Sequence, residues 1–254
     1  MALHSVELTD LEHQIYERQM PIPGIGTAGQ QRLKGAAVLI SRVGGLGGTV
    51  AMLLARAGVG TLVLAHDGEV EPENLNRMHL AFYEDLHQPR IEVFCRTLRQ
   101  INPDLRLVAE PENIHSGNVA RLMEQADVAV DGAPLFAERY TMNQEAIRQR
   151  KPLIMAAQYG LEGYVSTFLP GSTACLSCVY PEPPENWNLR CFPVIAPSSA
   201  LVGTIAAMEA IKLLTGCGSP LANRLLYCDL TNNIFQKLRI DRRADCLVCG
   251  NVEA

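Results

Sequence analysis

The sequence of 254 residues has no run of like charges, no leader pattern at its start and no internal repeat. Lysine and arginine are scattered and the net charge is -5, so the chain lacks the basic field that holds a polyanion, and we expect no nucleic-acid partner. The first residues, MALHSVELTDLEHQ, have neither a basic start nor an apolar core of signal-peptide length. The most apolar long segment, residues 198–214, carries Glu209 and Lys212. We therefore expect a cytoplasmic protein that does not bind membranes.

The chain also lacks low-complexity tracts and linkers rich in glycine and serine, so nothing in it marks a domain boundary. Apolar residues make up 48% and charged residues 19%, which is ordinary for a protein with a sizeable core. The six histidines show no spacing typical of metal ligands. These features predict a single α/β domain over residues 1–254.

Apolar runs of strand length alternate with amphipathic segments through the first two thirds of the chain. The expected strands are residues 36–40, 61–65, 105–109, 127–130 and 153–157. The expected helices are residues 48–57, 88–101, 117–125 and 136–150. This βαβ rhythm predicts a Rossmann-like, doubly wound parallel sheet with helices on both faces. Beyond a long helix at residues 198–214, two closely spaced strands, 224–229 and 234–240, are expected to add to the sheet as antiparallel strands.

A glycine-rich stretch, SRVGGLGG at residues 41–48, joins the first expected strand to a helix. Gly44, Gly45 and Gly47 permit a tight turn and a close approach of backbone to a ligand, and unpaired amides at a helix start attract anions. The alternative is that these glycines only let the helix pack closely on the strand. Arg42 stands where such loops usually begin with glycine, and it either blocks a nucleotide or supplies a charge to it.

Four of the eight cysteines form two Cys-x-x-Cys pairs. A chain of this length builds its own core and does not need a disulfide framework, so the pairs favour a metal. Four thiolates in this arrangement match a closed tetrahedral zinc site that is structural in kind. The alternative is thiols that are buried or oxidised. The predicted zinc ligands are Cys175, Cys178, Cys246 and Cys249.

Several short motifs recur in one order along nearly the whole chain. They are YERQ at 16–19, GGLGG at 44–48, NLNR at 74–77, HQPRIE at 87–92, INP at 101–103 and AMEAIK at 207–212. In this order and spacing, together with the cysteine pairs, they resemble the E1-like activating-enzyme superfamily of ThiF/MoeB/HesA type. The resemblance implies an enzyme of cofactor biosynthesis that binds ATP and magnesium, adenylates the C-terminal glycine carboxylate of a small ubiquitin-like carrier protein, and releases pyrophosphate.

The resemblance also assigns roles to particular residues. Arg18 matches an arginine that reaches the triphosphate across a homodimer interface, and Asn74 and Arg77 match further ATP contacts. Arg90 stands where the family has a lysine, which keeps the positive charge but changes its geometry. The resemblance divides the chain into an N-terminal helical segment (1–34), a nucleotide-binding half (35–158) and a zinc-binding and carrier-binding half (159–254).

Three positions depart from the family pattern at the nucleotide site. His66 stands where the family has its ribose-binding aspartate, and Asp67 follows one place late. Asp131 keeps the first aspartate of a pair after the fourth strand, but Pro134 replaces the second, which makes a magnesium site doubtful. Together with Arg42, these departures leave two hypotheses open: an adenylyltransferase acting on a carrier tail or a small-molecule acid, or a non-catalytic homologue that binds a carrier or a nucleotide.

One further thiol follows from the resemblance. Cys191 lies near the place where some family members carry a cysteine that takes a persulfide or a thioester, and Arg190 beside it would lower the pKa of a thiol. The alternative is an ordinary loop cysteine.

Overall fold

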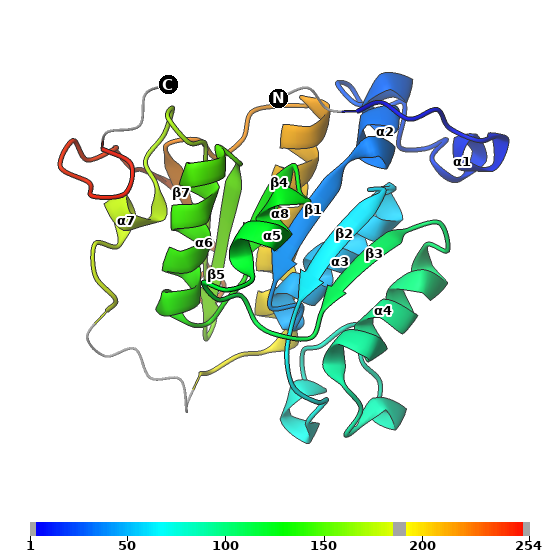
Figure 1. The fold of residues 1–254 in the computed structure, drawn as a ribbon, viewed down its shortest axis with the longest axis horizontal. Helices are drawn as coiled ribbons and strands as arrows, with labels where there is room; N and C mark the ends of the chain where they lie inside the picture. Colours follow the sequence, from blue (N-terminus) through cyan, green and yellow to red (C-terminus); the bar gives the residue numbers. More distant parts are fainter. Residues whose placement is uncertain (1–3, 185–191, 251–254) are drawn as a thin grey trace.

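The computed structural model describes residues 4–184 and 192–250. Its core is an eight-stranded sheet with the order β3-β2-β1-β4-β5-β6-β7-β8 (Figure 1). The parallel part contains β1 (Ala37–Ser41), β2 (Thr61–Ala65), β3 (Arg106–Glu110), β4 (Val128–Asp131) and β5 (Leu153–Tyr159). The antiparallel part contains β6 (Glu162–Phe168), β7 (Arg224–Asp229) and β8 (Ile234–Arg239). The predicted fold class is confirmed.

Helices cover both faces of this sheet. They are α1 (Asp10–Ile15), α2 (Gly26–Gly35), α3 (Gly45–Ala57), α4 (Arg90–Ile101), α5 (Val119–Glu124), α6 (Phe136–Gln149), α7 (Leu176–Val179) and α8 (Ala196–Thr215), with short 3-10 turns η1 (Pro72–Asn74) and η2 (Tyr83–Asp85). In Figure 1, α5 and α6 lie in front of the sheet and α3 and α8 lie behind it. Successive residues of β1 follow this division, because Val38 and Ile40 belong to one apolar cluster and Leu39 to the other.

Helix α3 begins at Gly45, three residues before the predicted start. The predicted helix started at Gly48 and so left Gly45 and Gly47 in the preceding turn. Glycine destabilises a helix interior, but this matters less in the first turn, where the backbone amides have no partner inside the helix. Close packing around the turn can also require a residue without a side chain. A Cβ on Gly47 would lie 2.4 Å from the Arg42 carbonyl oxygen, so the turn needs glycine there.

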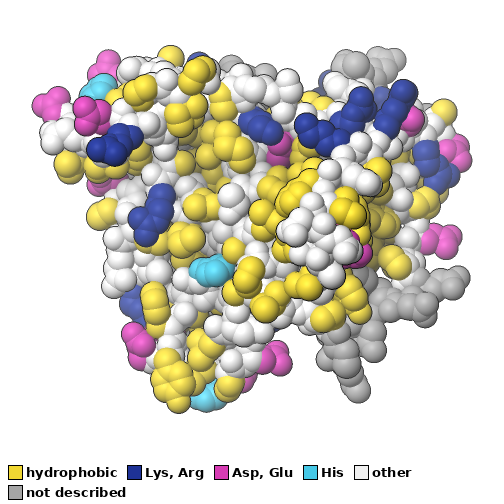
Figure 2. All heavy atoms as spheres, turned by 180° about the vertical axis from the view of Figure 1, so that it is seen from behind, with side chains coloured by type: hydrophobic (Ala, Val, Ile, Leu, Met, Phe, Trp, Pro, Cys, Tyr) yellow, Lys and Arg dark blue, Asp and Glu magenta, His cyan; other side chains and the backbone are white. Residues whose placement is uncertain are grey.

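Helix α8 is long and apolar enough to cross a membrane by length and composition, but 56% of its apolar window is buried inside the molecule. It packs against α3 and against β5 and β6, which makes it a core helix. Figure 2 shows the side of the molecule on which α3 and α8 lie, where hydrophobic side chains gather between scattered charged ones. Met208 of α8 is among the exposed hydrophobic residues.

A buried carboxylate fixes α8 to the sheet. Glu209 is 1% exposed. Its oxygens accept hydrogen bonds from the Thr167 hydroxyl (2.6 Å), the Leu221 amide (2.7 Å) and the Lys212 ammonium (2.5 Å). Because all three donors are satisfied by one side chain, Glu209 joins the helix, strand β6 and the segment before β7.

Replacing Glu209 by glutamine should lower the free energy of unfolding by about 2 kcal/mol, because an amide group then faces one of three donors and the charge opposite Lys212 is lost. A loss of this size would lower Tm by about 4–8 °C in a chain of this length. Thermal unfolding followed by circular dichroism measures it, with Glu92→Gln on the exposed side of α4 as the matched control. Equal Tm values for the two variants would contradict the assigned role.

Candidate functional site

The glycine-rich turn presents the start of α3 to an open space. Gly44 is the N-cap residue and provides no side-chain hydrogen bond to the helix. The first amides of α3 therefore point out of the helix with their partial positive charge. A Cβ on Gly45 would lie 2.9 Å from the Arg77 side chain, so glycine there lets an arginine approach the helix start.

A cavity of about 230 Å³ opens in front of this helix start. It lies beyond the carboxyl ends of β1, β2 and β4, at the point where the strand order reverses between β1 and β4. In doubly wound sheets this is the position where ligands bind. The sequence-predicted residues that line it are Arg42, Gly44, Gly45, His66, Asn74, Arg77 and Arg90, joined by Pro134.

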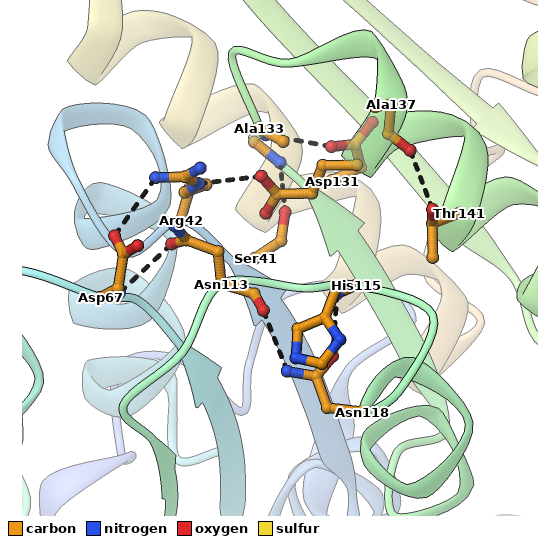
Figure 3. A network of polar contacts seen from close by, with 12 residues as sticks. Ser41, Arg42, Asp67, Asn113, His115, Asn118, Asp131, Ala133, Ala137 and Thr141 are labelled. Atoms are coloured by element: carbon orange, nitrogen blue, oxygen red, sulfur yellow. Dashed lines mark hydrogen bonds and ion pairs between the residues drawn. The ribbon is translucent and has the colours of Figure 1, made fainter.

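Other predicted residues lie elsewhere. Gly47 lies within the first turn of α3, and Asp67 lies beside Arg42 with 3.6 Å between the ion-pairing atoms. Asp131 is fully buried, and its carboxylate accepts a hydrogen bond from Arg139 at 2.9 Å. It also accepts one from the amide of Ala133 at 3.0 Å (Figure 3). Arg18 is exposed and does not line the cavity, and Cys191 lies outside the described residues.

Arg42 adopts a left-handed backbone conformation with φ of 54°, which explains why glycine is the usual residue at this position. Its Nε donates a hydrogen bond to Glu138 on α6 at 2.9 Å. Figure 3 shows Asp67 beside Arg42. The pKa of the Glu138 carboxyl is raised, because burial outweighs the opposing effect of Arg42. The charge of Arg42 is therefore balanced by two carboxylates, which leaves little of it for a ligand.

Sequence reasoning missed Glu138. An acidic residue in the first turn of a helix is common because it complements the helix dipole, so nothing in the sequence sets this one apart. The only available signal was the arginine at a glycine position, because an arginine turned toward a protein interior needs a buried carboxylate.

Arg77 and Arg90 keep their charge for a ligand. Arg77 donates hydrogen bonds to the Glu73 carbonyl (2.6 Å) and to the Asn76 side chain (2.9 Å). Arg90 donates twice to the Asn74 side chain, at 3.2 and 2.8 Å. These partners are neutral oxygens that fix the guanidinium groups without neutralising them. Burial lowers the pKa of both arginines, and nearby carboxylates oppose the shift: Glu73 for Arg77, and Asp67 and Glu71 for Arg90. No carboxylate oxygen of the described residues lies within 4 Å of either guanidinium group, so these charges are only partly compensated. The site therefore favours an anion.

His66 stands neutral among these arginines. It is 4% exposed, and its pKa is lowered to about 3, first by burial and then by the charges of Arg90 and Arg42, while a hydrogen bond with the Val43 backbone opposes the shift. Its Nδ1 is buried and has no hydrogen-bond partner among the residues that the structure describes.

The pKa of His66 predicts how stability depends on pH. The folded value of about 3 lies below the unfolded value of about 6.5, so the unfolded chain takes up the proton first and stability falls as the pH drops below about 6.5. Between pH 6.5 and 5 the loss from this one group is roughly 1.5 kcal/mol. His66→Gln should remove that part of the loss in urea unfolding, whereas the exposed-site control His115→Gln should keep it. Parallel pH curves for the parent and His66→Gln would refute the assignment.

The cavity fits a magnesium ion poorly. Magnesium requires oxygen ligands, carboxylates above all. Among the lining residues that the structure describes, Glu73 is the one that carries a carboxylate, since Pro134 offers no ligand and Asp131 is held by Arg139. Guanidinium groups, not a metal, dominate the electrostatics here.

The four cysteines of the two pairs come together in space, although the pairs are far apart in the sequence. One pair lies at the start of α7 and within it, and the other lies in the segment after β8. Their sulfur atoms are 3.9 Å (Cys175–Cys178), 3.7 Å (Cys175–Cys246) and 3.4 Å (Cys178–Cys249) apart. A tetrahedral zinc with Zn–S bonds of about 2.3 Å requires sulfur separations of about 3.8 Å. The backbone amide of Arg243 also points at Cys178 Sγ, at 3.4 Å. The cluster therefore fits a tetrahedral metal ion.

Comparison with known proteins agrees with this architecture. The model of the ThiF family matches residues 16–248. The protein HesA, heterocyst, of Trichormus variabilis is 44% identical over 97% of this chain and 92% of its own length. The sulfur carrier protein ThiS adenylyltransferase of Escherichia coli is 35% identical over 97% of this chain and 99% of its own length. The crystal structure of Escherichia coli MccB with ATP is 25% identical and superposes with a TM-score of 0.79, over 88% of this chain and 69% of that one.

Proposed function

The chain belongs to the ThiF family, and from this premise we propose that it is an ATP-dependent adenylyltransferase that activates a carboxylate. The observation that carries the proposal is the cavity at the switch point of the sheet, where the start of α3 and the guanidinium groups of Arg77 and Arg90, both held by neutral oxygens, converge. Relatives named as sulfur carrier adenylyltransferases, and a structural relative solved with ATP, support the same kind of chemistry.

In the proposed reaction, a carboxylate oxygen attacks the α-phosphorus of ATP. The bond from this phosphorus to the oxygen that bridges it to the β-phosphate breaks, so the products are an acyl adenylate and pyrophosphate. Charge accumulates on the phosphate oxygens during this step. Arg77, Arg90 and the amides of α3 would stabilise that charge without moving, because Asn74 and the backbone of Glu73 already hold the two guanidinium groups in place. His66 would line the same cavity as a neutral group.

The site also requires a second subunit under this proposal. Gln19 donates a hydrogen bond to the Ala57 carbonyl at 2.9 Å, so the segment that carries Arg18 is anchored at the far end of α3. A helix of 13 residues is about 20 Å long, and the cavity opens at its other end. Arg18 of the same chain therefore cannot reach the phosphates. A homodimer, in which each Arg18 serves its partner's cavity, explains why this exposed arginine lies in a family motif.

A non-catalytic function is the second candidate. It is favoured by Pro134 in place of a metal-binding aspartate and by the pairing of Arg42 with Glu138, both of which depart from a metal-dependent catalyst. Such a homologue would bind a carrier protein or a nucleotide without turning it over.

Exchange of labelled pyrophosphate into ATP distinguishes the two functions. We expect exchange to depend on a carboxylate substrate, drawn from a panel of carrier proteins that end in Gly-Gly and of small organic acids. The panel should be run on folded protein whose ATP binding has been measured by calorimetry. Binding of ATP with no exchange for any member would reject catalysis in favour of the second candidate.

A further inference from the structure

A second cavity, of about 310 Å³, adjoins the cavity in front of α3, which we call the nucleotide cavity. The two share Arg139, Ala157 and Gln158 in their walls. A molecule in the second cavity would thus present one end to the space in front of α3. We call it the acceptor cavity. It lies between α6, the adjoining ends of β5 and β6, and α7.

The walls of the acceptor cavity are largely aromatic and apolar. Phe136, Tyr159, Tyr164 and Tyr180 contribute rings, and Leu176 contributes an aliphatic side chain that is 1% exposed. The rings of Phe136 and Tyr180 pack edge to face with centroids 5.5 Å apart. Leu176 begins α7, directly after the first cysteine of the metal cluster, so the cluster holds this wall in place. The space is therefore built into the fold.

The charges in these walls do not cancel. Arg139 donates to Asp131 at 2.9 Å, so that pair is neutral overall. Within residues 4–184 and 192–250, Glu162 has no cationic partner of this kind: its oxygens accept hydrogen bonds from the hydroxyls of Tyr164 (2.8 Å) and Tyr227 (2.7 Å). The bond to Glu162 raises the pKa of Tyr227 to about 12, so that phenol stays neutral. The acceptor cavity thus carries one negative charge among aromatic rings, which is the environment that a cation on an apolar stem prefers.

We propose that the acceptor cavity selects its carboxylate by a basic side chain, whose ammonium or guanidinium group lies against Glu162 and the tyrosine rings while the carboxylate reaches the nucleotide cavity past Gln158. The inference rests on the proposed function, because it takes the nucleotide to lie in front of α3. Strand pairing supports the geometry: Tyr159 of β5 lies opposite Glu162, and Gln158 lies opposite Gly163. A tail that ends in glycine has no side chain to fill 310 Å³.

Calorimetry without nucleotide tests this selection directly. The probes are Nα-acetylarginine and Nα-acetyllysine, compared with Nα-acetylnorleucine, which keeps the stem without the charge, and with Nα-acetylglycine, which has no side chain. We expect the basic probes to bind at least tenfold more tightly than norleucine, and glycine to bind more weakly still. Glu162→Gln should remove most of the preference for a basic probe, whereas Asp241→Asn, an exposed acid beside Arg239, should keep it.

Equal binding of the arginine and norleucine probes to the parent protein, or an unchanged preference in Glu162→Gln, would overturn the inference. Because no nucleotide is present, neither result bears on adenylation. Pyrophosphate exchange driven by a Gly-Gly carrier, with no preference for a basic probe, would uphold the proposed function and reject this inference.

A pentapeptide that ends in arginine, run beside Nα-acetylarginine, separates the two sources of such a group: tighter binding of the peptide indicates a peptide tail, and equal binding indicates a small basic acid.

Discussion

Arg18→Ala should lower ATP–pyrophosphate exchange about 100-fold, because it removes a cation that stabilises charge developing on the phosphates. Arg77→Ala should do the same from within the cavity. If Arg18 serves the partner's cavity, the two defects complement each other in mixed dimers. With equal amounts of the variants, half of the dimers are mixed and each of these has one complete site, so activity should recover to roughly a quarter of the parental value.

Exchange measured on the separate variants and on the co-expressed mixture gives this result directly, with Arg56→Ala on the exposed side of α3 as the control. An Arg18 that acted within its own chain would leave both sites of every mixed dimer defective. A mixture with no more activity than the separate variants would therefore rule out the shared site. Full activity of Arg18→Ala would remove Arg18 from the reaction altogether.

Removal of the metal should have the largest effect on stability. The cluster ties Cys175 to Cys246 across 71 positions of the sequence, and closing a loop of that length is worth about 4 kcal/mol in chain entropy. Cys246→Ser should release the metal and lower Tm by about 8–16 °C. The loss should fall short of complete unfolding, because the main apolar clusters on both faces of the sheet do not include the cysteine ligands.

Elemental analysis of the purified protein checks the first part of this prediction, with one zinc per chain expected in the parent and none in Cys246→Ser. Thermal unfolding checks the second. Cys217→Ser, at a buried cysteine outside the cluster, is the matched control and should keep its zinc. A parent protein without metal, or a Cys246→Ser variant that retains it, would show that the four thiols are not a zinc site.

The fold and the four-cysteine cluster could be predicted from the sequence, because each depends on patterns that are local in it. Alternation of apolar runs with amphipathic segments specifies a doubly wound sheet, because each strand must be covered on both faces. The spacing of two cysteine pairs identifies four ligands without any knowledge of the fold between them. The same is true of Gly47, where a Cβ would lie 2.4 Å from the Arg42 carbonyl oxygen of the strand-to-helix turn.

The behaviour of the charged residues was not predictable in this way. Arg42 lines the cavity as expected, yet its charge is balanced by Glu138, a residue 96 positions away. Asp131 lies at the expected strand end, yet Arg139 holds its carboxylate inside the protein. Pairings of this kind depend on how α6 docks beside β1 and β4, and no periodicity in the sequence encodes that docking.

The amino-acid sequence by itself determined the order of the elements, the turn in front of α3 and the four sulfur ligands, because each depends on spacing along the chain. Tertiary structure alone decided which cations lack a carboxylate partner among the described residues, and that the segment with Arg18 is anchored at the opposite end of α3 from the cavity of its own chain. It also decided that an aromatic space with the carboxylate of Glu162 adjoins that cavity. These properties arise where strand ends and helices from distant segments converge, and charge balance and cavity shape exist only after they have packed together.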